Sequence, residues 1–283
     1  MYKDLGRLEL REIQDTEAKV KKKFKYLDAD KVETAKEHIV KLLSTPNYFV
    51  RELVGKKLTE YHDDEKMDQL ILGLLGHKTY GVRAATTFYY FLRHNDDPKK
   101  IINLLEMSWH DTPWETEHIL YEMWNKYPKI MKKEMSNWAA STFEKQRALA
   151  YHGMETLAAH DPLFVLNTVE KNIDDGDVDL QKKMSVVLTS VIKTKPAECY
   201  PFIREWITKP SENRINTLCI VMKKLVGMAV THHGHGKANK NDEFRLLTMQ
   251  TIADWKSDHD TNVADMGKTL VAFSKNPIED FEI

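Results

Sequence analysis

The sequence predicts an all-α fold made of stacked helix pairs, and three observations lead to this prediction. Basic residues recur along the chain at intervals of 32, 64, 35 and 32 positions. Prolines recur at intervals of 30, 34 and 34, out of phase with the basic residues. Apolar residues at helical spacing follow both markers. A period slightly above thirty that holds two helices is typical of a helical-repeat solenoid.

The two markers open different helices of each pair. Proline suits the first position of a helix, because its missing N–H would have no partner there. The prolines that begin the first helices are Pro98, Pro128, Pro162 and Pro196. The basic residues near the start of the second helices form a row of Arg51, Arg83, Arg147, Lys182 and Arg214. The double interval contains one more copy, in which Glu115 replaces the base. We therefore predict a HEAT-like α-α superhelix of about six helix pairs with capping helices.

We expect one domain over residues 1–283, in which residues 1–29 form an N-terminal cap with a lysine-rich helix from about Asp15 to Leu27. The repeats occupy residues 30–229, residues 230–242 form a loop rich in His and Gly, and residues 243–283 hold two closing helices and a tail. The expected helix pairs span 30–44 and 47–61, 65–76 and 80–94, 97–107 and 113–126, 128–139 and 142–159, 161–173 and 178–193, 196–208 and 211–229, and the closing helices span 243–256 and 260–274.

The composition limits the possible functions. A formal charge of −1 with 30% charged residues excludes a globally basic nucleic-acid binder, so affinity for phosphate must come from a local patch. Cys199 and Cys219 lie in helical patterns, which indicates structural thiols in a reducing compartment. The first residues lack the pattern of a signal peptide and no apolar run could span a membrane. We expect a cytoplasmic protein that does not contact membranes.

The loop after the repeats contains His232, His233 and His235. Two imidazoles separated by one residue can share a metal, but the cluster contains no Cys, Asp or Glu. We interpret it as a solvated loop and predict neither a metal nor a cofactor.

The row of basic residues admits two interpretations. Equivalent positions of successive units align along the concave side of a stacked array, where Lys183, Lys223 and Lys224 would flank the row and help it follow a phosphate backbone. Alternatively, the row is a structural ladder of arginines paired with acids about six positions earlier. Those earlier positions hold Thr45, His77, Ser141, Gly176 and Thr208, so we predict that the acidic partners are missing.

The segment from Met107 to His118 departs from the other units, because it carries Trp109 and Trp114 and an acid where a base is expected. An aromatic ring beside carboxylates suits a cationic ligand. We expect Trp114 to pack in the core together with Trp124, and leave Trp109 open between core and ligand contact. Asp111 either caps the following helix or remains available to a ligand.

These segments carry a resemblance to a known family. The matching pieces are Ser108–Asp111, Leu120–Pro128, Asn137–Ser141, Gln146–Ala148 and Lys193–Pro196. In their order and spacing, over roughly residues 100–208, the sequence resembles the AlkD-like DNA alkylation repair proteins. That resemblance implies a HEAT-like solenoid that grips duplex DNA in its concave groove and, in active members, excises N3- or N7-alkylated purines.

The resemblance also implies site residues. The family places a Trp and an Asp four positions apart, an Arg in the Gln-Arg segment, and a second Trp two units further on. Trp109 and Arg147 match this pattern, whereas Pro113 occupies the position of the acid and Val186 that of the second Trp. The nearest carboxylates are Asp111, Glu115 and Glu117.

The sequence therefore predicts a monomeric DNA-binding protein of the alkylation-repair type, whose partner is duplex DNA, damaged or branched. Asp111 and Glu115 are the candidate catalytic carboxylates of a glycosylase, and Trp109 is the candidate lesion contact. The candidate DNA-binding residues are Arg51, Arg83, Arg147, Lys182, Lys183 and Arg214. Two alternatives stay open: a relative that binds DNA without catalysis, and a non-enzymatic scaffold that binds a protein partner.

Overall fold

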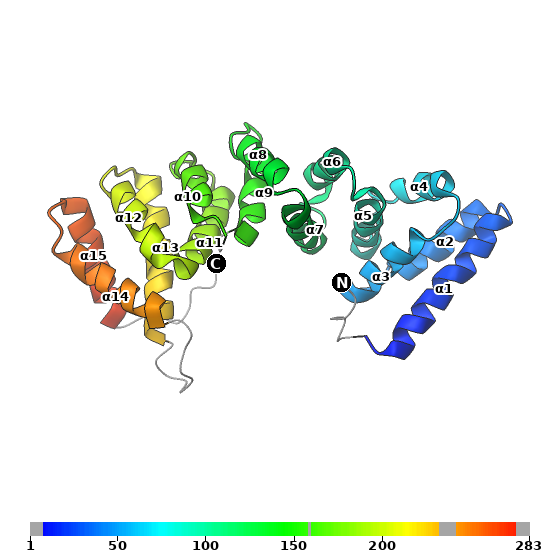
Figure 1. The fold of residues 1–283 in the computed structure, drawn as a ribbon, viewed down its shortest axis with the longest axis horizontal. Coiled ribbons are helices and arrows are strands. Elements are labelled where there is room, and N and C mark those ends of the chain that lie inside the picture. The colour runs from blue at the N-terminus through cyan, green and yellow to red at the C-terminus, as the bar shows by residue number, and fades with distance from the viewer. Residues whose placement is uncertain (1–7, 158–159, 232–241, 276–283) are drawn as a thin grey trace. The chain divides into compact units, whose positions relative to one another are not determined.

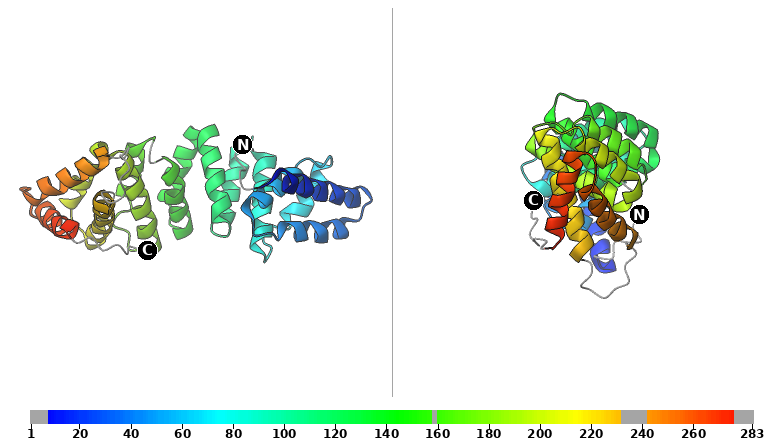
Figure 2. Two further views of the ribbon diagram at one scale, coloured as in Figure 1. Left: turned by 90° about the horizontal axis from the view of Figure 1, so that it is seen from below. Right: turned by 90° about the vertical axis from the view of Figure 1, so that its left-hand side faces the viewer.

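A computed structural model describes residues 8–157, 160–231 and 242–275 of the protein (Figures 1 and 2). Within these residues every regular element is a helix, and successive helices pair side by side, which confirms the all-α helical-repeat class. The histidines of residues 232–235 lie outside the described residues. None of the described helices is both long and apolar enough to cross a membrane.

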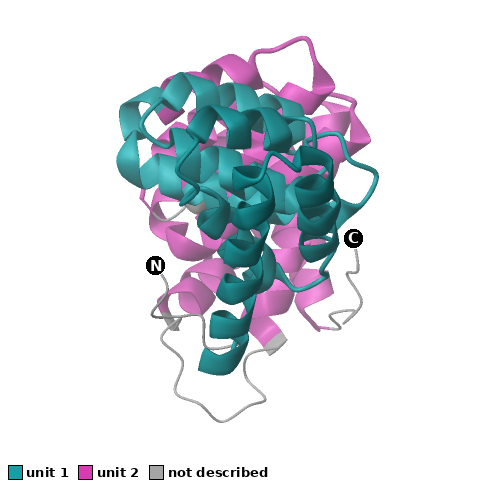
Figure 3. Ribbon diagram, turned by 90° about the vertical axis from the view of Figure 1, so that its right-hand side faces the viewer, with its two compact units in different colours: residues 1–130 teal, residues 131–283 magenta. Residues whose placement is uncertain are grey.

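The chain forms two compact units, residues 1–130 and 131–283 (Figure 3). One continuous array of repeats therefore stays a prediction. The helices of the first unit are α1 (Leu10–Asp28), α2 (Val32–Leu43), α3 (Tyr48–Leu58), α4 (Asp64–Leu72), α5 (Tyr80–His94), α6 (Pro98–Ser108) and α7 (Pro113–Lys126). From α8 (Pro128–Ala139) onward follow α9 (Glu144–Met154), the 3₁₀ turn η2 (Glu155–Leu157), α10 (Pro162–Glu170), α11 (Val178–Thr194), α12 (Pro196–Ile207), α13 (Glu212–Thr231), α14 (Asp242–Lys256) and α15 (Thr261–Lys275).

The predicted helix starts are largely confirmed. α6, α8, α10 and α12 each begin at a proline of the predicted series. Asp97 and Asp161 cap two of these helices, since their carboxylates accept hydrogen bonds from backbone N–H groups three residues later, at 3.2 and 3.1 Å. The largest difference concerns α1, which begins before the predicted lysine-rich segment. The Glu9 N–H donates to the Glu12 carboxylate at 2.9 Å, so the start of the helix is satisfied there.

Close helix packing organises the first unit. The second helices α3 and α5 approach each other so closely at Gly55 that a Cβ there would lie 3.0 Å from the carbonyl oxygen of Ala85. The packed interior joins side chains of five helices, among them Val20, Ile39, Leu58, Ile71, Val82 and Tyr89. Because these buried faces fix the rotation of each helix, they also determine which residues of the second helices remain exposed.

In the second unit, the second helices α9, α11 and α13 contact one another in chain order, and α14 and α15 close the stack. In Figure 1 the first helices α10 and α12 lie above α11 and α13. Trp138, Tyr151 and Trp206 are among its fully buried side chains. Cys199 is buried and Cys219 is half-buried, and both are free thiols.

Candidate nucleic-acid interface

Each of the four arginines in the predicted basic row makes the same kind of hydrogen bond. In each, Nη1 donates to a backbone carbonyl five or six residues earlier, in the loop before its own helix. The bonds join Arg51 to Pro46 at 2.7 Å, Arg83 to His77 at 2.7 Å, Arg147 to Ser141 at 3.1 Å, and Arg214 to Lys209 at 3.0 Å. One side of each guanidinium thus holds the loop and is occupied before any ligand arrives.

Arg51 uses its other side to bind Glu115. Its Nε and Nη2 both donate to Glu115 Oε1, at 3.2 and 2.7 Å, and the Tyr80 hydroxyl donates to Oε2 at 2.7 Å. The guanidinium carbon also lies 5.2 Å from the centre of the Tyr80 ring and 5.7 Å from that of Tyr48. These contacts join α3, α5 and α7 through one buried cluster.

The burial of this cluster corrects two assignments made from the sequence. Arg51 is 4% exposed and Glu115 is fully buried. Arg51 is therefore no longer a candidate for DNA contact, and Glu115 is no longer a candidate for catalysis, because no ligand can reach either group. The unit with an acid in place of a base uses that acid to neutralise the arginine two repeats earlier.

Arg147 and Arg214 form ion pairs with two acidic residues in the turn between α10 and α11. Arg214 donates from Nε to Asp174 Oδ1 at 3.1 Å and pairs with Oδ2 through Nη2. Arg147 Nε lies 3.3 Å from Asp175 Oδ2. The prediction that acidic partners are missing is therefore wrong for Arg51, Arg147 and Arg214, because stacking supplies their acids from other units rather than from six positions upstream. Arg214 is mostly buried in its ion pair and is a weak candidate for phosphate contact.

Arg83 differs from the other three arginines. Its Nη1 donates to two carbonyls, but it forms no ion pair with any residue that the structure describes. Its Nε is buried without a hydrogen-bond partner in that part of the chain, and its guanidinium lies 5.9 Å from the centre of the Tyr80 ring. Of the arginines in the row, Arg83 therefore keeps the largest capacity for an added anion.

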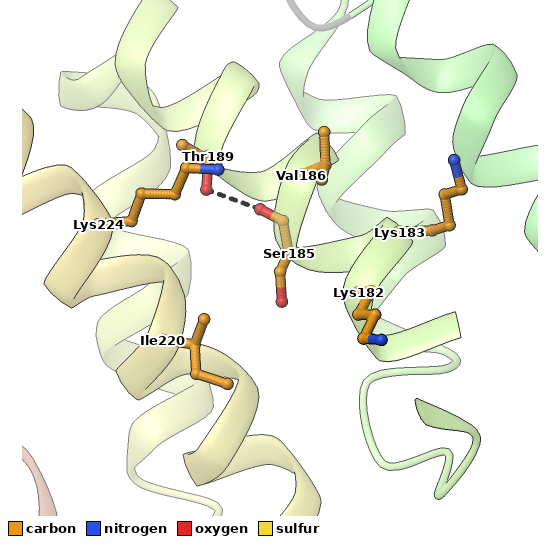
Figure 4. Close-up of a pocket in the computed structure, with 7 residues that line it drawn as sticks. All are labelled: Lys182, Lys183, Ser185, Val186, Thr189, Ile220 and Lys224. Carbon is orange, nitrogen blue, oxygen red and sulfur yellow. Dashed lines mark hydrogen bonds between the residues drawn. The ribbon is translucent and has the colours of Figure 1, made fainter. Parts of the chain in front are cut away.

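The lysines of the second unit present a different arrangement. A hollow of about 300 Å³ opens between α11 and α13, and no acidic side chain lines it (Figure 4). Its lining consists of Lys182, Lys183, Ser185, Val186, Thr189, Ile220 and Lys224. We name Lys182, Lys183 and Lys224 the lysine face. None of the three forms an ion pair within the described residues, so their charges are available to a ligand.

The remaining lining determines what the lysine face can hold. Ser185 and Thr189 donate their hydroxyl protons to backbone carbonyls one turn earlier, at 2.8 and 2.7 Å, so the ammonium groups are the donors free for a ligand. Val186 and Ile220 are 40% and 39% exposed and supply an apolar portion. The sequence predicted Lys182 and Lys183 as DNA-binding residues and Lys224 as a residue that flanks the basic row. It did not predict the apolar portion, apart from placing Val186 at the position of the family's second Trp.

Only some side chains of the aromatic and acidic segment from Met107 to His118 are exposed to a ligand. Trp109 is 8% exposed, with its ring centre 5.5 Å from that of His110. Asp111 is exposed and does not cap α7, whose N-cap is Thr112. Trp124 is buried as predicted, whereas the prediction of a buried Trp114 is wrong, since its side chain is 67% exposed. Asp111 is thus the accessible member of the two predicted catalytic carboxylates.

No cluster of three His, Cys, Asp or Glu side chains suited to a metal occurs among the described residues. No protein-family model matches the chain. No curated protein matches it either. Among solved structures, the chain is similar to the crystal structure of an engineered protein at 11% identity, over 90% of this chain and 96% of that chain, with a TM-score of 0.26. A likeness of this size carries no argument about function.

Proposed function

We propose that the protein binds duplex DNA, and that the lysine face of the second unit contacts the phosphate backbone. The observation that carries the proposal is the set of three lysines in the lining of one hollow, without an acid in the lining or an ion pair in the described residues. Phosphates attract such groups and release counterions on binding, so a local patch suffices even when the net charge is −1. The resemblance to the alkylation-repair family supports DNA as the polyanion.

Excision of an alkylated purine is the enzymatic form of this proposal. Glu115 is neutralised by Arg51, so Asp111 would supply the carboxylate that stabilises the positive sugar as the base departs. Release of 7-methylguanine from methylated duplex DNA by the purified protein, and its loss in Asp111→Asn, tests this form. DNA binding without release, in the wild type and with every lesion tried, would leave a protein that binds DNA without catalysis.

Binding is tested by fluorescence anisotropy with a labelled duplex at several salt concentrations. The variant reverses all three charges of the lysine face, Lys182→Glu, Lys183→Glu and Lys224→Glu. The control reverses three exposed lysines elsewhere in the unit, Lys133→Glu, Lys171→Glu and Lys256→Glu, and changes the net charge equally.

We expect the lysine-face variant to bind at least about tenfold more weakly, with a salt dependence reduced by up to about one unit of slope per lysine. The control should bind within about twofold of the wild type, because its lysines lie outside the contact. Equal losses in both variants would reduce the effect to net charge, and unchanged binding in the lysine-face variant would refute the proposal.

A second candidate is the protein-binding scaffold, and the apolar portion of the lining favours it. Val186 and Ile220 cannot pair with phosphate, but they suit the apolar face of an acidic amphipathic helix, whose carboxylates would pair with the lysines. Val186→Asn with Ile220→Asn distinguishes the candidates. This variant should retain DNA affinity if phosphate is the ligand and lose affinity for an acidic amphipathic peptide if a helix is the ligand.

A further inference from the structure

A stripe of exposed aromatic side chains runs along α7 in the first unit. Trp114 and Tyr121 are 67% and 54% exposed, and seven residues of helix return to almost the same face. His118 lies between them and is half-buried, with its ring edge-on to Phe88 at 5.6 Å between centres. We name Trp114, His118 and Tyr121 the α7 stripe.

The orientation of the α7 stripe is fixed by the opposite face of the helix. Ile119, Leu120, Met123 and Trp124 of α7 are buried in the first unit, so the helix cannot rotate to hide Trp114 and Tyr121. A single exposed aromatic residue needs no explanation. Two large ones aligned on one helix face form the kind of anchor that protein interfaces use, since Trp and Tyr dominate binding energy there.

Carboxylates flank the stripe. Glu117 is exposed and lies one turn from both Trp114 and Tyr121, and Glu122 lies one turn from His118 and is half-buried. The buried Glu52 of α3 lies near the stripe, because His118 and Glu122 both shift the pKa of its carboxyl group. Burial raises the pKa of Glu52, while His118 and Lys56 lower it and Glu122 raises it further. The surroundings of the stripe are thus rich in acid.

This charge decides the chemistry of the occupant. Proteins that stack nucleobases on aromatic residues combine them with positive charge that tracks the phosphates, whereas Glu117 and Glu122 repel phosphate. Carboxylates beside exposed rings suit lysine and arginine, which pair with the acids and lie over the ring faces. The exposed rings also offer apolar area to the hydrocarbon side chains of the same partner.

We propose that the α7 stripe docks a basic amphipathic segment of a partner protein. Trp114 and Tyr121 contact its apolar face and the stems of its cations, and Glu117 and Glu122 pair with its ammonium and guanidinium groups. This surface does not depend on the DNA-binding proposal, because it lies in the other unit and has the opposite charge.

The test uses the whole chain and a synthetic peptide probe. The probe is an amphipathic helix of about 14 residues made of Lys and Leu, and its counterpart carries Glu in place of every Lys. Isothermal titration calorimetry measures affinity for the wild type, for Trp114→Ala with Tyr121→Ala, and for Glu117→Gln with Glu122→Gln. The matched control, Leu10→Ala with Leu72→Ala, removes two exposed apolar side chains elsewhere in the same unit.

We expect the wild type to bind the Lys peptide. The Glu peptide matches the charge of the lysine face instead, so the aromatic variant should bind it as the wild type does. For the Lys peptide, the aromatic variant should lose about tenfold or more in affinity, and the glutamine variant should lose both affinity and salt dependence. Trp114→Phe with Tyr121→Phe should restore most of the binding. All variants should unfold at the wild-type temperature and bind duplex DNA normally, because none of the altered side chains is buried and all lie outside the lysine face.

Three results would overturn the proposal. The Lys peptide could bind the aromatic variant as tightly as the wild type, or the leucine control could lose as much affinity as the aromatic variant. Alternatively, the wild type could bind a single-stranded oligonucleotide, and the aromatic variant lose that binding, which would make the stripe a nucleic-acid surface.

Discussion

Replacement of Glu115 by Gln tests whether Glu115 is the buried structural partner of Arg51 rather than a catalytic carboxylate. The substitution keeps the shape of the side chain but removes its charge, so the buried guanidinium of Arg51 loses its counterion. Loss of one partner of a buried ion pair costs about 3–5 kcal/mol. Gln retains an acceptor for one of the hydrogen bonds, so we expect the lower end of this range, about 3 kcal/mol. For a domain of this size that lowers Tm by about 6–12 °C.

The assay is thermal unfolding followed by circular dichroism, with Asp111→Asn as the matched control. Asp111 undergoes the same chemical change but is exposed, so its Tm should stay within about 2 °C of the wild type. Arg51→Met combined with Glu115→Leu removes both charges together. It should be more stable than Glu115→Gln, because no isolated charge remains in the interior.

A wild-type Tm for Glu115→Gln would refute the structural role of Glu115. So would a double variant whose loss of stability equals or exceeds the sum of the losses in Arg51→Met alone and Glu115→Leu alone, since the two residues would then show no favourable coupling. If Glu115→Gln folds normally and loses release of alkylated purine, Glu115 returns as a catalytic candidate. The same measurement thus separates a structural carboxylate from a chemical one.

Two further predictions concern stability. Gly55→Ala should destabilise the first unit by about 1–3 kcal/mol in chemical denaturation, since its Cβ would press on the α5 backbone. Gly76→Ala, with no atom within 4 Å of the added Cβ, should have an effect below about 0.5 kcal/mol, and equal losses would contradict the packing argument. Hydrogen bonds from Arg204 and a backbone N–H lower the pKa of Asp258 to about 2, so its contribution is present above about pH 4 and lost as pH falls toward 2. The Tm difference between the wild type and Asp258→Asn should be constant from about pH 5 to 8 and shrink below about pH 4, and a difference that grows on acidification would contradict the sign.

Local chemistry made the helices predictable before any coordinates. Proline at a first helical position and an Asp before it satisfy the end of a helix within a few residues, as Asp97 does for α6. The same holds for the period of the repeat, because each unit must bury its own apolar stripe against its neighbours. α1 extended beyond its predicted start for an equally local reason, the bond from Glu9 to Glu12, which the pattern of lysines had obscured.

The sequence alone was thus sufficient to predict the class of fold, the position of most helix starts and the lysines now proposed to bind phosphate. Each of these depends on residues within one or two helical turns. The partners of the arginines were not accessible in this way. Arg51 and Glu115 are 64 residues apart, and Arg214 and Asp174 are 40 apart, so packing of whole helices decides that they meet. Packing also turned Trp114 outward. A helix has one rotation in the stack, and the face of α7 that buries Ile119 and Met123 leaves Trp114, on the opposite side, in water.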